Sequence, residues 1–84
     1  MTVVVFKSKT EVFSFMERAR RVGIGGKVVS TPKEIKIGCG LAVAIADNYA
    51  MSAWGVIRNG DFQTFYGIFK IKRNGLKSSL TRVV

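Results

Sequence analysis

Two segments with helical patterning separate four short apolar segments, and this order constrains the fold more than any other feature. Residues 2–6 (TVVVF) form a β-branched run that is too short for a helix and is typical of a strand buried on both faces. Apolar side chains recur at helical spacing in residues 9–22, and Gly23 is suited to end that helix. Ser8 and Glu11 match the capping box with which many helices begin. The chain is therefore expected to open with a strand and an amphipathic helix.

The same alternation continues along the rest of the chain. Residues 27–30 and 41–45 are short apolar segments that we predict to be strands. Asp47 is positioned to cap a second helix over residues 48–58, and the aromatic and β-branched segment 62–72 is predicted to be the last strand. The order β-α-β-β-α-β is typical of an α+β, ferredoxin-like split βαβ sandwich, with a four-stranded antiparallel sheet and two helices on one face.

The length of 84 residues allows one small domain, and the 48% hydrophobic content supplies its core. We assign residues 1–73 to a single domain and residues 74–84, at the turn signal Asn74-Gly75, to a basic C-terminal tail. Both faces of the predicted sheet are apolar, so the face without helices would expose a hydrophobic patch. We therefore expect a homo-oligomer, or another partner, to cover this open sheet face.

Charge and composition narrow the possible functions. Fourteen Lys and Arg against five Asp and Glu give a net charge of +9, which favours anionic partners such as nucleic acid or an acidic protein. The absence of histidine excludes Cys–His and Ser–His pairs, and the scattered acidic residues show no metal-ligand spacing, so we expect neither a metal nor a cofactor. No signal peptide or membrane-spanning segment is visible, and a cytoplasmic protein is expected.

The single cysteine, Cys39, is the strongest candidate for a chemical role. It lies between Gly38 and Gly40 in a connection of about ten residues between two predicted strands, and long connections often carry function. Flanking glycines would let another molecule approach the backbone closely and would expose the sulfur. Lys33 and Lys36 in the same loop would stabilise a thiolate, which favours nucleophilic chemistry or the transfer of a sulfur-type group. The alternative is that this lone cysteine is a small buried hydrophobe.

The loop and the start of the chain also resemble a known family. The opening VVVFKSKTEVFSFMERARRVGI is followed by VVSTPKEIKIGCGLAVAI, and the most specific part is Thr31-Pro32-Lys33-Glu34 followed by Gly38-Cys39-Gly40. Over about residues 3–72, this pattern resembles the selenium/sulfur carrier-like family. The resemblance implies that Cys39 holds sulfur or selenium as a persulfide or selenosulfide, between a protein donor and a protein acceptor. It implies a stoichiometric carrier or adaptor more than an enzyme that turns over on its own.

Other residues of the loop have predicted supporting roles. The candidates for holding an anionic substrate or an acidic partner near the sulfur are Lys33, Lys36, Gly38 and Gly40. Pro32 would stiffen the loop, since its ring restricts the backbone, and Glu34 is a second loop-shaping candidate. Lys33 and Glu34 could equally be a solvated pair on the surface.

The alternative function is a basic interaction module that binds nucleic acid or an acidic protein, with a structural cysteine. The predicted topology is shared with the RNA-recognition module, and the segment 62–72 combines aromatic residues with cations. That module displays its stacking aromatics on the first and third strands, where this chain has only Phe6, and its sequence signature is missing here. We therefore favour carriage of sulfur or selenium over nucleic-acid binding.

Overall fold

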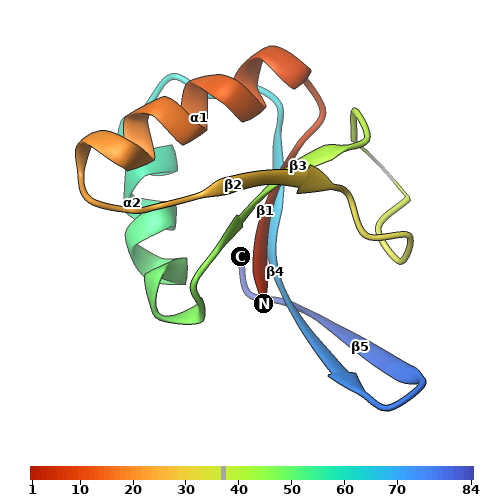
Figure 1. Cartoon of the computed structure of the whole chain (residues 1–84). Helices are drawn as coiled ribbons and strands as arrows, with labels where there is room; N and C mark the ends of the chain where they lie inside the picture. The colour runs from red at the N-terminus through yellow and green to blue at the C-terminus, as the bar shows by residue number, and fades with distance from the viewer. Residues whose placement is uncertain (37) are drawn as a thin grey trace.

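The computed structural model describes every residue of the chain except residue 37 (Figure 1). The described elements are, in order, β1 (Thr2–Phe6), α1 (Lys9–Arg21), β2 (Lys27–Ser30), β3 (Leu41–Ile45), α2 (Ala50–Asn59), β4 (Phe65–Asn74) and β5 (Lys77–Arg82). A short 3-10 helix, Asp47–Tyr49, leads into α2. The predicted α+β class with two helices and an antiparallel sheet is confirmed, but the predicted number of four strands is wrong, because the described sheet has five.

The strands form one antiparallel sheet in the order β2-β3-β1-β4-β5. β1 lies in the middle, with Val4 paired with Val43 of β3 on one side and with Ile68 of β4 on the other. All five residues of β1 are buried, which is why its sequence is a continuous apolar run instead of an alternating one. β1 and β2 are parallel with β3 between them, and β3 and β4 are parallel with β1 between them. Each helix therefore connects two parallel strands that flank a third.

Both helices pack on the same face of the sheet, as Figure 1 shows. Their buried side chains, among them Val12 and Phe15 of α1 and Ala53 of α2, share one core cluster with Val4 and Phe6 of β1. The ring centroids of Phe6 and Phe15 lie 5.6 Å apart. Because a large apolar side chain contributes roughly 1.5–3 kcal/mol when fully buried, the apolar stripe predicted for α1 is what holds this helix on the sheet.

The opposite face of the sheet is covered by the chain itself. Val3 and Val5 of β1 have 0% exposure, and they share a second core cluster with Ile35 of the β2–β3 loop. Leu80 of β5 packs against the same cluster. The expected homo-oligomer rested on an exposed apolar patch on this face, and these residues are not exposed, because the loop and the β4–β5 hairpin cover them.

Residues 74–84 turn back on the sheet, contrary to the predicted basic tail. Gly75, with a φ of 63°, is the first residue of a two-residue loop, and β5 then pairs with β4 over six residue pairs. A positive φ at that position is the pattern of a type II′ turn, whose twist suits a hairpin. At the base of the hairpin, the guanidinium of Arg82 lies 5.1 Å from the ring centroid of Tyr66 and 5.7 Å from that of Phe69. The hairpin projects away from the helices (Figure 1).

The start of α1 differs from the predicted capping box. Ser8 is the N-cap residue, but its side chain makes no capping hydrogen bond. Glu11 instead accepts hydrogen bonds from the backbone N–H groups of Gln63 and Thr64, at 2.8 and 2.7 Å, and from the Thr64 hydroxyl at 2.5 Å. The carboxylate therefore joins the first turn of α1 to the segment that enters β4.

Asp47 does not cap the second helix either. Its Oδ1 accepts a hydrogen bond of 2.7 Å from the hydroxyl of Thr2 and lies 3.4 Å from the N-terminal ammonium of Met1. The hydrogen bond from Thr2, together with the nearby ammonium, holds the pKa of Asp47 below its ordinary value. α2 begins at Ala50, two residues later than predicted, because Asp47–Tyr49 form a 3-10 helix, and Asp47 bonds to the buried Thr2 hydroxyl on β1.

Candidate functional site

The loop between β2 and β3 contains all of the predicted site residues. A backbone hydrogen bond of 2.9 Å from the Thr31 N–H to the Gly40 carbonyl closes its base. Ile35 packs on the sheet face without helices, whereas Cys39 packs against the core on the helix face. The predicted loop at 31–40 contains neither helix nor strand in its described part, and residue 37 lies outside the described residues. The loop, which joins the ends of β2 and β3, therefore contacts both faces of the sheet.

Cys39 is half-buried, so it is neither fully presented to solvent nor enclosed in the core. Its Sγ lies 3.7 Å from the carbonyl oxygen of Leu41, as a weak donor. The residue packs against the edge of the helix-side cluster while both neighbouring glycines are exposed. A partner that reacts with this thiol must therefore reach it from the exposed side of the turn.

Gly38 and Gly40 shape the turn that holds Cys39. Their φ angles are 119° and 88°, in a region that residues with a side chain rarely adopt. A Cβ on Gly38 would lie 3.2 Å from the carbonyl oxygen of Phe6, whereas a Cβ on Gly40 would meet no atom within 4 Å. Gly38 is therefore required both by backbone conformation and by space, and Gly40 by conformation alone. Their predicted part in holding an anion stays a prediction.

The other limb of the loop faces the β4–β5 hairpin. Pro32 is buried and Lys33 is exposed, while Glu34 accepts a hydrogen bond of 3.0 Å from the hydroxyl of Ser78 on β5. Lys36 is exposed. This hydrogen bond could not be predicted from the sequence, since its two residues lie 44 positions apart, and the loop-shaping role of Glu34 stays a prediction. Stabilisation of the Cys39 thiolate by the two lysines remains a prediction.

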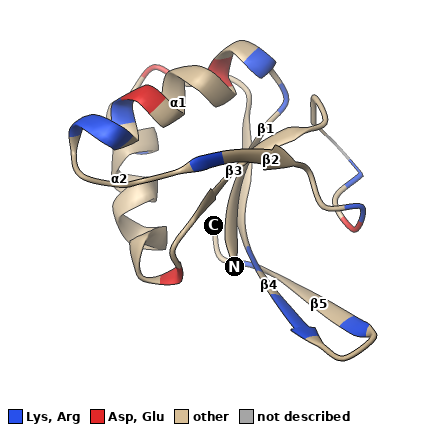
Figure 2. Cartoon of the chain, in the orientation of Figure 1, with Lys and Arg blue, Asp and Glu red and all other residues tan. Residues whose placement is uncertain are grey.

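A cleft of about 520 Å³ separates this limb from the tip of the hairpin. Its lining includes Lys33 and Glu34 from the loop and Arg73, Lys77 and Ser78 from the hairpin. Figure 2 shows positions of Lys and Arg, in blue, on both the β2–β3 loop and the hairpin. Cys39 and Lys36 are not among the lining residues that the structure describes. The predicted site lacks the hairpin residues because residues 74–84 are predicted to be a tail, although Asn74-Gly75 is a turn signal.

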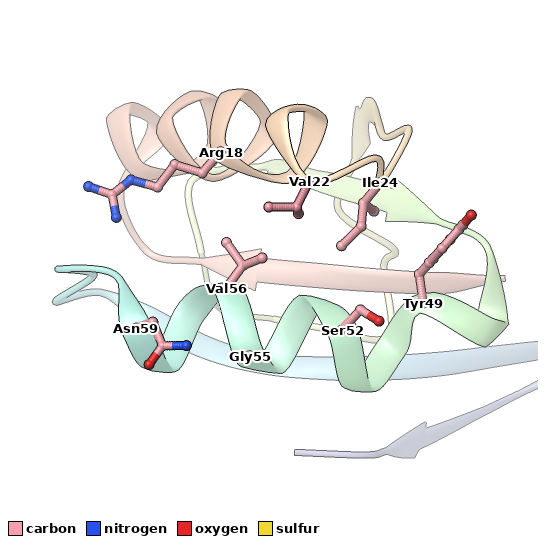
Figure 3. A pocket seen from close by; sticks show the side chains of 8 residues that line it. All are labelled: Arg18, Val22, Ile24, Tyr49, Ser52, Gly55, Val56 and Asn59. Carbon is pink, nitrogen blue, oxygen red and sulfur yellow. The ribbon is translucent and has the colours of Figure 1, made fainter.

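A second hollow, of about 510 Å³, lies between the two helices and contains none of the predicted site residues (Figure 3). Val22, at the end of α1, and Val56 of α2 approach it from opposite sides. Arg18 lies at one end, with its guanidinium 5.4 Å from the ring centroid of Phe62. It is a largely apolar groove between packed helices, without the chemistry found in the β2–β3 loop.

The aromatic residues of β4 do not form an exposed stacking platform. Phe69 is 6% exposed, and its ring stacks on that of Tyr66 with Arg82 over both. In the described part of the chain, no three His, Cys, Asp or Glu side chains gather as metal ligands would. None of the described helices has the length and apolar character needed to cross a membrane.

Fold and loop together define a small α+β domain whose single cysteine lies in a glycine-flanked turn beside the sheet. Residues 1–64 of the 84-residue chain match the family described as "Putative Se/S carrier protein-like", and the chain belongs to this family. The matched residues contain the whole Cys39 loop and end before β4. No significant match is found among curated proteins or among solved structures.

Proposed function

We propose that this protein is a sulfur or selenium carrier that holds the transferred atom on Cys39 as a persulfide or selenosulfide. The observation that carries the proposal is the position of the only cysteine, between two glycines of positive φ in a loop of a Se/S carrier-like chain. A carrier needs one accessible thiol and no second thiol to resolve the loaded form. With a single cysteine, an intramolecular disulfide cannot discharge the carried atom.

The transfer is a thiol exchange that is balanced without an external oxidant. The Cys39 thiolate attacks the terminal sulfur of a persulfide on a donor protein, forming a new S–S bond as the donor's S–S bond breaks. The donor leaves as a thiolate, and the persulfide on Cys39 retains the sulfur at the same oxidation level. A thiolate of the acceptor then repeats the attack on the outer sulfur and releases the Cys39 thiolate. Selenium would follow the same sequence as a selenosulfide.

The half-buried thiol suits a carrier that protects its cargo between partners. The open space beside Gly40 leaves one side of the turn free for the attacking thiol of a partner. The packing of Cys39 against the helix-side core shields the other side. Lys33 and Lys36 would favour an acidic donor or acceptor, as the net charge of +9 does for the whole chain.

We also infer that β1–β4 and the two helices form a ferredoxin-like core, to which β5 is an addition at one edge. The strand order β2-β3-β1-β4 and the two crossed βαβ connections support this assignment. The carrier loop then lies at the turn between the middle pair of strands in sequence.

The loading reaction tests the proposed function. The protein is incubated with a cysteine desulfurase and cysteine in buffer without reductant, and its intact mass is measured. We expect the wild type to gain one sulfur atom and Cys39→Ser, which has no thiol, to gain none. Selenocysteine in place of cysteine tests selenium in the same way. An equal gain by Cys39→Ser, or no gain by wild type with active desulfurase, would exclude Cys39 as the carrier.

The second candidate function is a basic module that binds nucleic acid or an acidic protein. One face of the hairpin favours it, because Lys70 and Lys72 of β4 are paired with Thr81 and Ser79 of β5, and all four side chains are exposed. A two-stranded ribbon of this composition suits a polyanion. RNA binding that resists salt and is unchanged in Cys39→Ser would support this candidate over the carrier.

A further inference from the structure

The cleft between the β2–β3 loop and the hairpin tip is lined by cations from both segments. Lys33 contributes from the loop, and Arg73 and Lys77 contribute from β4 and β5. The lining also includes the hydroxyl-bearing residues Ser30 and Thr31. Cations from two separate segments thus share one concave surface, although they are about 40 positions apart in the chain.

The cations of the cleft form no ion pairs among the described residues. No carboxylate lies within 4.0 Å of the charged atoms of Lys33, Arg73 or Lys77 in the part of the chain that the structure describes. The acidic residue of the lining, Glu34, accepts a hydrogen bond from Ser78 instead. The Thr31 side-chain oxygen, at the same wall, is buried without a hydrogen-bond partner among the described residues. Three cations against one carboxylate leave an excess of positive charge on the lining of the cleft.

The size of the cleft favours a small anion over a polymer. Its volume of about 520 Å³ lies within the roughly 300–1,000 Å³ typical of small-molecule sites. Lys70 and Lys72, which precede Arg73 in β4, are not among its lining residues. A planar guanidinium binds two oxygens of one phosphate at once, whereas lysines act as point charges.

We propose that this cleft binds a small phosphate-bearing anion, with Arg73 as the bidentate ligand and with Lys33 and Lys77 adding positive charge from the two walls. The site is distinct from the carrier thiol, because the described lining does not include Cys39. Anion binding is therefore expected to be the same in Cys39→Ser as in the wild type. Anion binding in the cleft and sulfur loading on Cys39 can thus be tested separately.

The test is an NMR titration of the isotope-labelled full chain with pyrophosphate at constant ionic strength. We expect saturable shifts at the amides of the Lys33 loop and of the hairpin tip. The double variant Arg73→Gln/Lys77→Gln is expected to bind at least about tenfold more weakly, since charge-assisted hydrogen bonds are lost. Lys33→Gln, on the opposite wall, is expected to weaken binding as well. Because Lys33 lies outside the hairpin, this variant tests the site even if the double variant destabilises the hairpin.

A matched control removes the same number of charges elsewhere. Lys9→Gln/Arg58→Gln changes two exposed cations at the start of α1 and the end of α2, and we expect its affinity to stay within about twofold of wild type. An equal loss of affinity in this control would overturn the site, because binding would then follow net charge alone. Titration without saturation would overturn it too. Saturation by a short single-stranded RNA and not by pyrophosphate would show that the cleft binds a polymer, against the proposal.

Discussion

At the scale of single residues, the backbone around Cys39 depends on two positions without a side chain. Gly38 has a φ of 119° and little room for a Cβ, because the carbonyl oxygen of Phe6 would lie 3.2 Å away. The packing of Cys39 against the helix-side core follows from this turn, since Gly38 and Gly40 set the direction of the residue between them. Substitution at Gly38 should therefore affect both stability and the reactivity of the thiol.

We predict that Gly38→Ala lowers the free energy of unfolding by about 1–3 kcal/mol, because alanine must adopt a strained φ and press on β1. The rate of Cys39 alkylation by iodoacetamide should change in the same variant. Gly55→Ala is the matched control, since Gly55 lies within α2 with open space around it, and it should stabilise the protein by about 0.5–1 kcal/mol. Denaturant unfolding measures both. Equal effects of the two substitutions would contradict a special conformation at Gly38.

The sequence indicated the glycine-flanked cysteine but not the contacts of its neighbours. Cys39, Gly38 and Gly40 could be identified because a lone thiol between glycines in a long connection is a local pattern. The hydrogen bond from Ser78 to Glu34, and the cleft that Arg73 and Lys33 both line, depend on a hairpin formed by the last residues of the chain. No local pattern encodes such a contact.

At the scale of elements, the local pattern of apolar residues predicted the strands and helices that bury their side chains. β1, β2 and β3 lie where their apolar runs predicted, and α1 spans nearly the predicted residues. The sequence did not predict β5, because KSSLTR has little apolar content. All of its residues are exposed except Leu80, which is partly buried. The two predicted helix caps failed for a different reason: Glu11 and Asp47 bond to groups brought close by tertiary packing.

The link between α1 and the start of β4 gives a prediction for acid stability. Burial raises the pKa of Glu11, but hydrogen bonds from the Thr64 hydroxyl and from the N–H groups of Gln63 and Thr64 outweigh it, so the pKa is lowered. The ionised carboxylate therefore stabilises the folded state at neutral pH, and this contribution is lost as pH falls through the lowered pKa. We expect Glu11→Gln to be less stable than the wild type by about 1–2 kcal/mol at neutral pH.

This difference should shrink as the pH falls through the lowered pKa of Glu11, because the wild-type carboxylate is then protonated as well. Glu17→Gln is the control, because Glu17 is exposed and pairs only with Arg20 and Arg21 on the surface of α1, and it should change stability by less than about 0.5 kcal/mol. Urea unfolding at several pH values gives both results. A deficit of Glu11→Gln that is independent of pH would mean that the charge of Glu11 does not contribute.

At the scale of the whole molecule, both apolar faces of the sheet are covered by other parts of the same chain. The helices cover one face, and the β2–β3 loop and the hairpin cover the other, where Val3 and Val5 have no exposed area. We expect the protein to be a monomer at tens of micromolar by light scattering. A stable dimer under these conditions would show that an exposed surface, and not the sheet face, associates.

The carrier role is tested most directly by following the intact mass of the chain through loading and release. After treatment with desulfurase and cysteine, and removal of both, a thiol acceptor is added and the mass is followed with time. We expect the wild type to gain the mass of one sulfur atom and then to lose it to the acceptor. The mass of Cys39→Ser should not change at any stage. A mass that never rises, or that rises on the serine variant as well, would contradict it.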